Sequence, residues 1–156
     1  MLKQYRNVAA VLVVGIAMAS GSIAADKKIT RAQLPAAVER TVAQQSQGAV
    51  IKGFSTETEA GKAVYEMELT VNGHGKDVSM DAQGNILEIE EEVALASLPA
   101  VVQGGLTRAA GTGKIVKVES MSKQGTLVAY EATVQSGKKR REIQVGPQGQ
   151  KLAHPE

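Results

Sequence analysis

The chain has 156 residues, of which 18 are basic and 16 acidic, with no cysteine and 3% aromatic residues. This length accommodates one domain or two small ones. The lack of cysteine excludes disulfides, a cysteine nucleophile and a lipid-modified cysteine, so aliphatic packing must stabilise the fold.

The first 25 residues have the features of a secretion signal peptide. Lys3 and Arg6 give a positively charged start, residues 8–19 are apolar, and small residues precede Asp26. This order is typical of a cleaved signal, and the apolar run is shorter than the roughly 20 residues that a membrane span needs. We therefore expect a periplasmic or secreted protein with no stable membrane anchor after cleavage.

Cleavage of this segment would also remove the excess of positive charge. Lys3 and Arg6 account for the formal net charge of +2, which leaves 16 basic and 16 acidic residues in the rest of the chain. Balanced charge and an exported location both argue against a nucleic-acid partner.

After the signal, the sequence repeats itself. Leu34-Pro35 recurs as Leu98-Pro99, and Tyr65-Glu66 recurs as Tyr130-Glu131. Apolar and glycine positions agree along both copies, with one inserted residue in the second. Such self-similarity indicates a duplicated unit, and we expect one copy over residues 26–93 and another over residues 94–156.

Each copy begins with the signals of a helix. Apolar residues recur at every fourth position, at Leu34, Val38 and Val42 and again at Leu98, Val102 and Leu106. This spacing forms an apolar stripe on one side of a helix. Pro35 and Pro99 suit the first helical turn, where a missing N–H is tolerated.

Strand signals follow each helix. Runs rich in β-branched residues cover 50–56 and 115–121, and the two Tyr-Glu strands come next. Third strands are expected over 76–80 and 141–145, and turns at 81–84 and 146–149 lead to short final strands. The predicted class is therefore α+β, as two tandem repeats of one helix packed on an antiparallel sheet of three to four strands.

Strand alternation decides which way the repeated Tyr-Glu pair points. Tyr65, Met67 and Leu69 share one apolar face, which we expect to pack against the helix. Tyr130 has the same place in the second copy, so both tyrosines are predicted to be core residues rather than catalytic groups. In the fourth strand, Leu87 and Ile89 are expected to point inward as well.

The outward positions of the predicted sheet gather acidic residues. In the first copy they are Glu66, Glu68, Asp77, Asp81, Glu88 and Glu90, and Glu131 occupies the matching place in the second. One interpretation is a solvated face. The other is a docking surface for a basic protein partner, or a weak cation site.

The two copies also differ in charge. Residues 26–93 hold 7 basic and 12 acidic residues, giving −5, whereas residues 94–156 hold 9 basic and 4 acidic residues, giving +5. Opposite charges steer encounters between surfaces, so a head-to-tail homodimer is a further hypothesis.

Other motifs support no catalytic, cofactor or metal site. Residues 138–141, "KKRR", are expected at a solvated hairpin, with an anionic lipid or acidic partner as the alternative. Residues 111–114, "GTGK", follow a predicted helix instead of opening one, unlike a phosphate loop. His74 and Asp77 fall on opposite faces of a strand, and residues 88–92 lack the spacing of an EF-hand.

Two segments resemble the PepSY-like family, also described as β-lactamase-inhibitor-like: "LPAAVERTV" at residues 34–42 and "VYEMELTVNGHGKDVSMDAQGNILEIEEE" at residues 64–92. The pattern is a Leu-Pro helix start, a Tyr-Glu strand, an acidic-apolar strand and an Asp-x-x-Gly turn. The second copy matches less well, since Gly146 stands where the turn aspartate is expected. The resemblance covers nearly all of the chain after the signal.

This resemblance implies a helix-on-sheet fold and a non-enzymatic role, in which the protein binds or inhibits other proteins such as peptidases. It carries over no catalytic residue and no cofactor. The sequence as a whole therefore predicts an exported binding module for an unidentified envelope protein. The alternative is an envelope sensor or buffer for small cationic ligands or metal ions.

Overall fold

The computed structural model describes residues 27–156, so the predicted signal peptide lies outside the described residues. The elements in chain order are β1 (Lys27–Ile29), a 3₁₀ turn η1 (Arg31–Gln33), α1 (Ala36–Gln45), β2 (Val50–Glu59), β3 (Lys62–Val71), β4 (His74–Asp81), β5 (Ile86–Glu92), η2 (Leu95–Ser97), α2 (Ala100–Ala110), β6 (Lys114–Lys123), β7 (Thr126–Ser136) and β8 (Lys139–Val145). Within this range, neither helix is long and apolar enough to cross a membrane.

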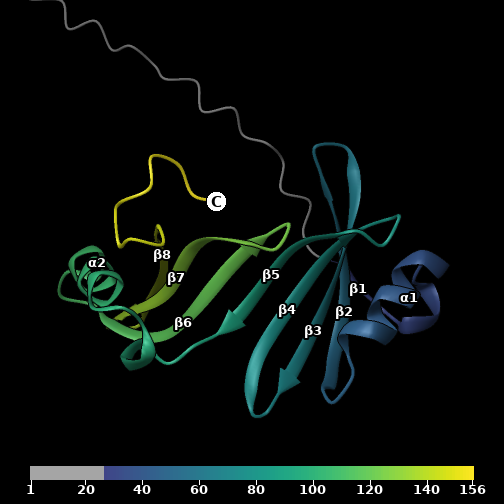
Figure 1. The fold of residues 1–156 in the computed structure, drawn as a ribbon, viewed down its shortest axis with the longest axis horizontal. Helices are drawn as coiled ribbons and strands as arrows, with labels where there is room; N and C mark the ends of the chain where they lie inside the picture. Colours follow the sequence, from purple (N-terminus) through teal and green to yellow (C-terminus); the bar gives the residue numbers. More distant parts are fainter. Residues whose placement is uncertain (1–26) are drawn as a thin grey trace, which may run out of the picture.

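All eight strands belong to one antiparallel sheet, in which they follow the order of the chain from β1 to β8 (Figure 1). The two copies share this sheet because β5, the last strand of the first copy, pairs with β6, the first strand of the second. The predicted α+β class with two tandem helix-and-sheet repeats is confirmed. The continuous sheet across the β5–β6 pairing is a feature that the repeat pattern alone does not reveal.

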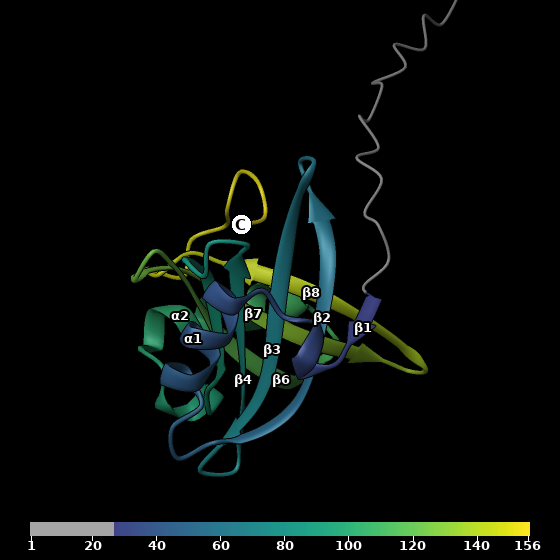
Figure 2. The ribbon, with the colours of Figure 1, turned by 90° about the vertical axis from the view of Figure 1, so that its right-hand side faces the viewer.

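Both helices cover the same face of the sheet. In the β5–β6 ladder Ile89 pairs with Ser122, so the face that packs on α1 continues along β6 to Val118 and the core under α2. Figure 1 places the helices at opposite ends of this face, and in Figure 2 both lie together to the left of β2 and β3. The other face of the sheet carries no helix in the described part of the chain.

Two apolar cores lie beneath the helices. Val38 and Val42 of α1 are fully buried against Met67, Val78 and Met80. Under α2, the buried core consists of Leu98, Val102, Leu106, Val118, Ala132 and Val145. The four-residue apolar spacing of the sequence therefore forms the packed side of each helix. Tyr65 and Tyr130 pack against these cores while partly buried, which confirms their predicted orientation.

A glycine turn contacts the helix in each copy. Gly84 has φ +79, and a Cβ built on it would lie 2.5 Å from the carbonyl oxygen of Ala37 in α1. The Thr41 hydroxyl donates a 2.7 Å hydrogen bond to the Gly84 carbonyl. In the second copy, a Cβ on Gly149 would overlap the Val101 carbonyl oxygen. Glycine is therefore needed both for the left-handed backbone and for the close approach.

The fold departs from the sequence prediction at three strands. The final strand expected in the second copy is wrong, because only an isolated bridge joins Val145 to Lys151 there. The short strand β1, which pairs with β2 through residues 54–56, has no predicted counterpart. In β5 the expected inward position of Leu87 is wrong. The register shifts there, since Ser79 pairs with Glu88 and Met80 pairs with Ile86. Leu87 is the extra residue, so it turns to the open face while Ile86 packs on the core.

Candidate functional site

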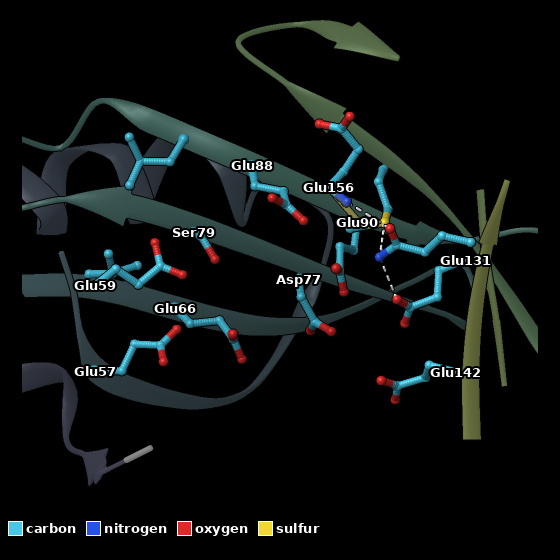
Figure 3. A pocket seen from close by; sticks show the side chains of 14 residues that line it. Glu57, Glu59, Glu66, Asp77, Ser79, Glu88, Glu90, Glu131, Glu142 and Glu156 are labelled. Carbon is cyan, nitrogen blue, oxygen red and sulfur yellow. Dashed lines mark hydrogen bonds between the residues drawn. The ribbon is translucent and has the colours of Figure 1, made fainter. Parts of the chain in front are cut away.

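The open face of the sheet, opposite the helices, contains a hollow of about 520 Å³. Its lining residues come from β2 to β8 and the segment after β8: Glu57, Glu59, Val64, Glu66, Asp77, Ser79, Leu87, Glu88, Glu90, Met121, Glu131, Glu142, Gln144 and Glu156. We refer to this set as the acidic hollow, because nine of its 14 side chains carry a carboxyl group and none is lysine, arginine or histidine. Figure 3 shows these carboxyl groups projecting from the strands into a shared space.

The acidic hollow is a direct product of strand alternation across paired strands. Glu66 on β3 pairs with Ser79 on β4, which in turn pairs with Glu88 on β5. In the next row Asp77 pairs with Glu90. Side chains of paired residues lie on the same face about 5 Å apart, so these rows place several carboxyl groups close together.

This face is acidic because the strands place carboxyl groups on it, and not because the chain has an excess of acidic residues. Although residues 94–156 carry +5 overall, their four acidic residues, Glu119, Glu131, Glu142 and Glu156, all lie on the open face. Lys117 and Lys123 on β6 form ion pairs on this face: Lys117 contacts Glu119 at 2.6 Å, and Lys123 lies 3.6 Å from Glu88. The side chains of the acidic hollow thus concentrate negative charge on one surface.

Three carboxylates meet at the centre of the open face. One oxygen each from Asp77, Glu90 and Glu119 lie within 4.8 Å of one another. Glu119 is only 6% exposed, and the Lys117 ammonium group partly neutralises it. Oxygen groups at this spacing suit a hard cation such as calcium.

Burial and mutual repulsion raise the pKa of several of these carboxyl groups. The pKa of Glu90 rises to about 8, through burial first and then a side-chain hydrogen bond with Glu88 and the charge of Glu119. Burial and the Glu119 charge also raise the pKa of Asp77. Burial raises the pKa of Glu131 as well, against the lowering effect of the 2.8 Å hydrogen bond from the Gln144 amide. These raised pKa values favour the protonated forms of the three groups, and a bound cation would favour their ionised forms instead.

The structure brings five of the predicted face residues together. Glu66, Asp77, Glu88, Glu90 and Glu131 all line the acidic hollow. Glu68 is exposed on the same face, where it pairs with Asp77 outside the lining set.

Asp81 lies on the same face, opposite Val64, but it does not line the acidic hollow. It closes the turn between β4 and β5, where its Oδ1 atom accepts 2.9 Å hydrogen bonds from the backbone N–H groups of Gln83 and Asn85. Its Oδ2 atom accepts a 2.8 Å bond from the Asn85 amide. The Asn85 hydrogen bonds lower the pKa of Asp81. The aspartate of the turn motif is therefore a structural residue.

The sequence prediction missed four acidic residues of the open face: Glu57, Glu59, Glu119 and Glu156. Glu57 and Glu59 lie on the same side of β2 as Ser55, which pairs with Glu66. Two-residue alternation along that strand could therefore have predicted their place on the open face. Strand alternation does predict an outward Glu142, which pairs with Thr133 on β7 in the copy whose net charge is positive. Its contribution depends on the two sheets being continuous, which the sequence does not show.

Comparisons with known proteins identify the fold. No protein-family model and no curated protein matches the chain. Among solved structures, a DUF2874 family protein from Bacteroides ovatus is 18% identical, with a TM-score of 0.60 over 76% of this chain and 84% of that one. A BLIP-like protein from Bacteroides fragilis is 21% identical, with a TM-score of 0.55 over 74% and 81%.

A candidate periplasmic protein from Bacteroides eggerthii is 15% identical, with a TM-score of 0.62 over 75% of this chain and 84% of that one. At these identities the likeness establishes a shared fold. The chain is thus similar in structure to Bacteroides DUF2874 and BLIP-like proteins.

Proposed function

We propose that this chain is an exported, non-enzymatic binding protein whose acidic hollow receives a basic segment of a cell-envelope protein. The observation that carries the proposal is the composition of the hollow, with nine carboxyl groups and no basic side chain among 14 lining residues. A concave surface of one charge sign attracts partners of the opposite sign and steers their approach.

The shape of the site also suits a protein partner. The hollow is lined from seven strands, and the face around it carries no helix in residues 27–156, so an extended segment can lie across it. The sequence resemblance to PepSY-like, β-lactamase-inhibitor-like proteins and the fold shared with a BLIP-like protein support binding over catalysis. A peptidase or another envelope enzyme that the protein restrains fits this role.

A titration with a defined cationic probe tests the proposal. An extended peptide of alternating lysine and glycine is titrated into the purified protein by calorimetry at low salt. Glu66→Lys on β3 and Glu142→Lys on β8 each place a cation in the hollow, and each should weaken binding about tenfold. Glu91→Lys makes the same change on the helix-bearing face of β5 and serves as the matched control. Equal effects of all three variants would contradict the proposal.

The central carboxylates favour a second candidate function, a sensor or buffer for small cations. Asp77, Glu90 and Glu119 offer oxygens within 4.8 Å of one another. Calorimetry with calcium, zinc and spermidine tests it. A micromolar site that Glu119→Gln abolishes would support it, whereas binding only at millimolar concentration would eliminate it.

A further inference from the structure

Within the described residues, the second copy has no strand equivalent to β5 of the first. In the first copy β5 pairs with β4, placing Ile89 opposite Val78 and Glu91 opposite Lys76. The strand equivalent to β4 in the second copy is β8, which ends the sheet. After β8, the chain makes one bridge between Val145 and Lys151 and then leaves the sheet (Figure 1). Within residues 27–156, no strand pairs with the outer edge of β8.

A second hollow lies where the side chain of that missing strand would pack. Its volume is about 560 Å³, and its lining includes Gly105 and Ala109 of α2 and Ile143 and Val145 of β8. In the first copy Ile89 packs in the matching place against the α1 core. The effect on burial is visible at the paired position, because Val78 is 0% exposed whereas its counterpart Ile143 is only partly buried. The core under α2 is therefore open on the side of β8.

The rim of this second hollow is positively charged. Arg108 and Lys151 belong to its lining, and no acidic residue does. Arg141 is exposed on β8, and its Nη2 atom donates hydrogen bonds of 3.1 Å and 2.8 Å to the carbonyls of Ala109 and Ala110 at the end of α2. This edge therefore favours a strand that carries an acidic residue beside its apolar one.

We propose that the edge of β8 accepts an added antiparallel strand from a protein partner, with an apolar residue opposite Ile143 and an acidic residue opposite Arg141. The register follows the first copy, in which Ile89 and Glu91 occupy these positions on β5. Main-chain hydrogen bonds give such a complex its affinity, and the alternate side chains give its specificity. The inference rests on the proposed function in requiring a protein partner, but it uses a different surface.

The charge of the edge argues against a second copy of this chain as the occupant. Lys139, Arg140 and Arg141 begin β8, and like charges on an edge strand oppose pairing with an identical edge. The segment after β8 also leaves room for the partner. It joins β8 through the Lys151 bridge to Val145 and through the Gln144 side chain, which accepts a 2.8 Å bond from the Glu156 N–H. On this outer edge, residues 139–143 pair with no other strand of the described chain.

An eight-residue peptide provides the test. Its sequence is that of residues 86–93 with Glu88→Thr, Glu90→Thr and Glu92→Thr, namely Ile-Leu-Thr-Ile-Thr-Glu-Thr-Val. These three changes leave no charged side chain on the side that would face the acidic hollow. Titrated into the full chain purified after export, the peptide should cause saturable NMR shifts and slower amide exchange at residues 139–143. A peptide with Ile89→Asp should bind about tenfold more weakly.

Charge exchange identifies the register. Arg141→Glu should weaken the peptide about tenfold, and a peptide with Glu91→Lys should recover the loss. Arg140→Glu, on the opposite face of the same strand, is the matched control and should leave affinity within about twofold. Thermal melts show that both variants fold. If the peptide with Glu91→Lys restores the affinity, Arg141 contacts the peptide directly. Weakened capping of α2 in the Arg141→Glu variant would not be restored by a change in the peptide.

Absence of saturation at millimolar peptide, or shifts confined to the acidic hollow, would overturn the inference. Glu66→Lys distinguishes this failure from failure of the proposed function. That variant should weaken binding of the lysine-glycine peptide about tenfold and leave binding of the β-strand peptide unchanged. Loss of both by Glu66→Lys would show that a single surface binds both peptides and would refute the separate edge site.

Discussion

Replacing Glu90 by glutamine should stabilise the protein at alkaline pH. The pKa of Glu90 rises from its ordinary value of 4.5 to about 8 in the folded protein, chiefly through burial. The folded state therefore binds more protons than the unfolded state between these two pH values. By linkage, the free energy of unfolding must fall as pH rises through this window and level off above it.

The size of this effect follows from the separation of the two pKa values. At about 1.4 kcal/mol for each pH unit, the full penalty at high pH would be roughly 4.8 kcal/mol. Glu90 is only partly buried, and solvent screening reduces the penalty to about 2 kcal/mol. Glutamine keeps the shape and removes the charge, so Glu90→Gln should gain about 2 kcal/mol at pH 9 and almost nothing at pH 4.

Urea denaturation at a series of pH values between 4 and 9 measures this gain. Glu91→Gln is the matched control, because Glu91 is exposed on the opposite face of the same strand. The control should show no gain that grows with pH. A gain for Glu90→Gln that is constant with pH, or a loss at pH 9, would refute the reasoning about the crowded carboxylates.

Three further predictions concern the scaffold. Leu106→Ala removes a side chain that is 0% exposed beneath α2, and chemical denaturation should show a loss of about 3 kcal/mol; a loss under about 1 kcal/mol would mean that this core is not packed as described. Gly84→Ala and Gly61→Ala both introduce a side chain at φ +79, but only the former meets the Ala37 carbonyl, at 2.5 Å. Gly61→Ala should therefore cost about 1 kcal/mol and Gly84→Ala at least about 2 kcal/mol more; equal thermal stabilities would contradict the close contact. Arg141→Ala removes the side chain that bonds the last carbonyls of α2, and should lower stability by about 1 kcal/mol, whereas Arg140→Ala should change it by less than about half that amount.

Local periodicity was sufficient to predict most of the fold. The four-residue spacing of Val38 and Val42 predicts the buried side of α1, and two-residue alternation predicts that Met67 packs inward. These patterns depend only on the geometry of one helix or one strand. The repeat of Tyr65-Glu66 as Tyr130-Glu131 then gives the second unit without any knowledge of pairing.

The features that the sequence missed depend on pairing between strands or on a single irregular residue. The β5–β6 ladder joins positions such as Glu90 and Met121, and no local pattern specifies that contact. One bulge residue is enough to turn Leu87 to the open face. Asp81 follows the alternation of β4, but the turn that begins there uses both of its carboxylate oxygens.

The candidate site was predicted in part for the same reason. Two-residue alternation predicts that Glu66 and Glu88 point to the open face of their own copy. Only the continuous sheet brings Glu142 of the other copy into the same hollow. Charge counting by copy was misleading here. It suggested a basic second half, although every acidic residue of that half lies on the acidic face. The charge of one face depends on which side chains the strands direct toward it, so the net charge of a copy does not predict it.

Site-specific photo-crosslinking in a cell-envelope extract tests the central claim most directly. A photoreactive phenylalanine derivative replaces Ser79, on the floor of the acidic hollow, or Thr107, exposed on α2. Thr107 reports contacts with the opposite side of the molecule. If the acidic hollow receives a basic segment, Ser79 should form crosslinks to a lysine- or arginine-rich segment of an envelope protein, and Glu66→Lys should remove them. Crosslinks of equal yield from Thr107, or crosslinks that persist with Glu66→Lys, would contradict the account.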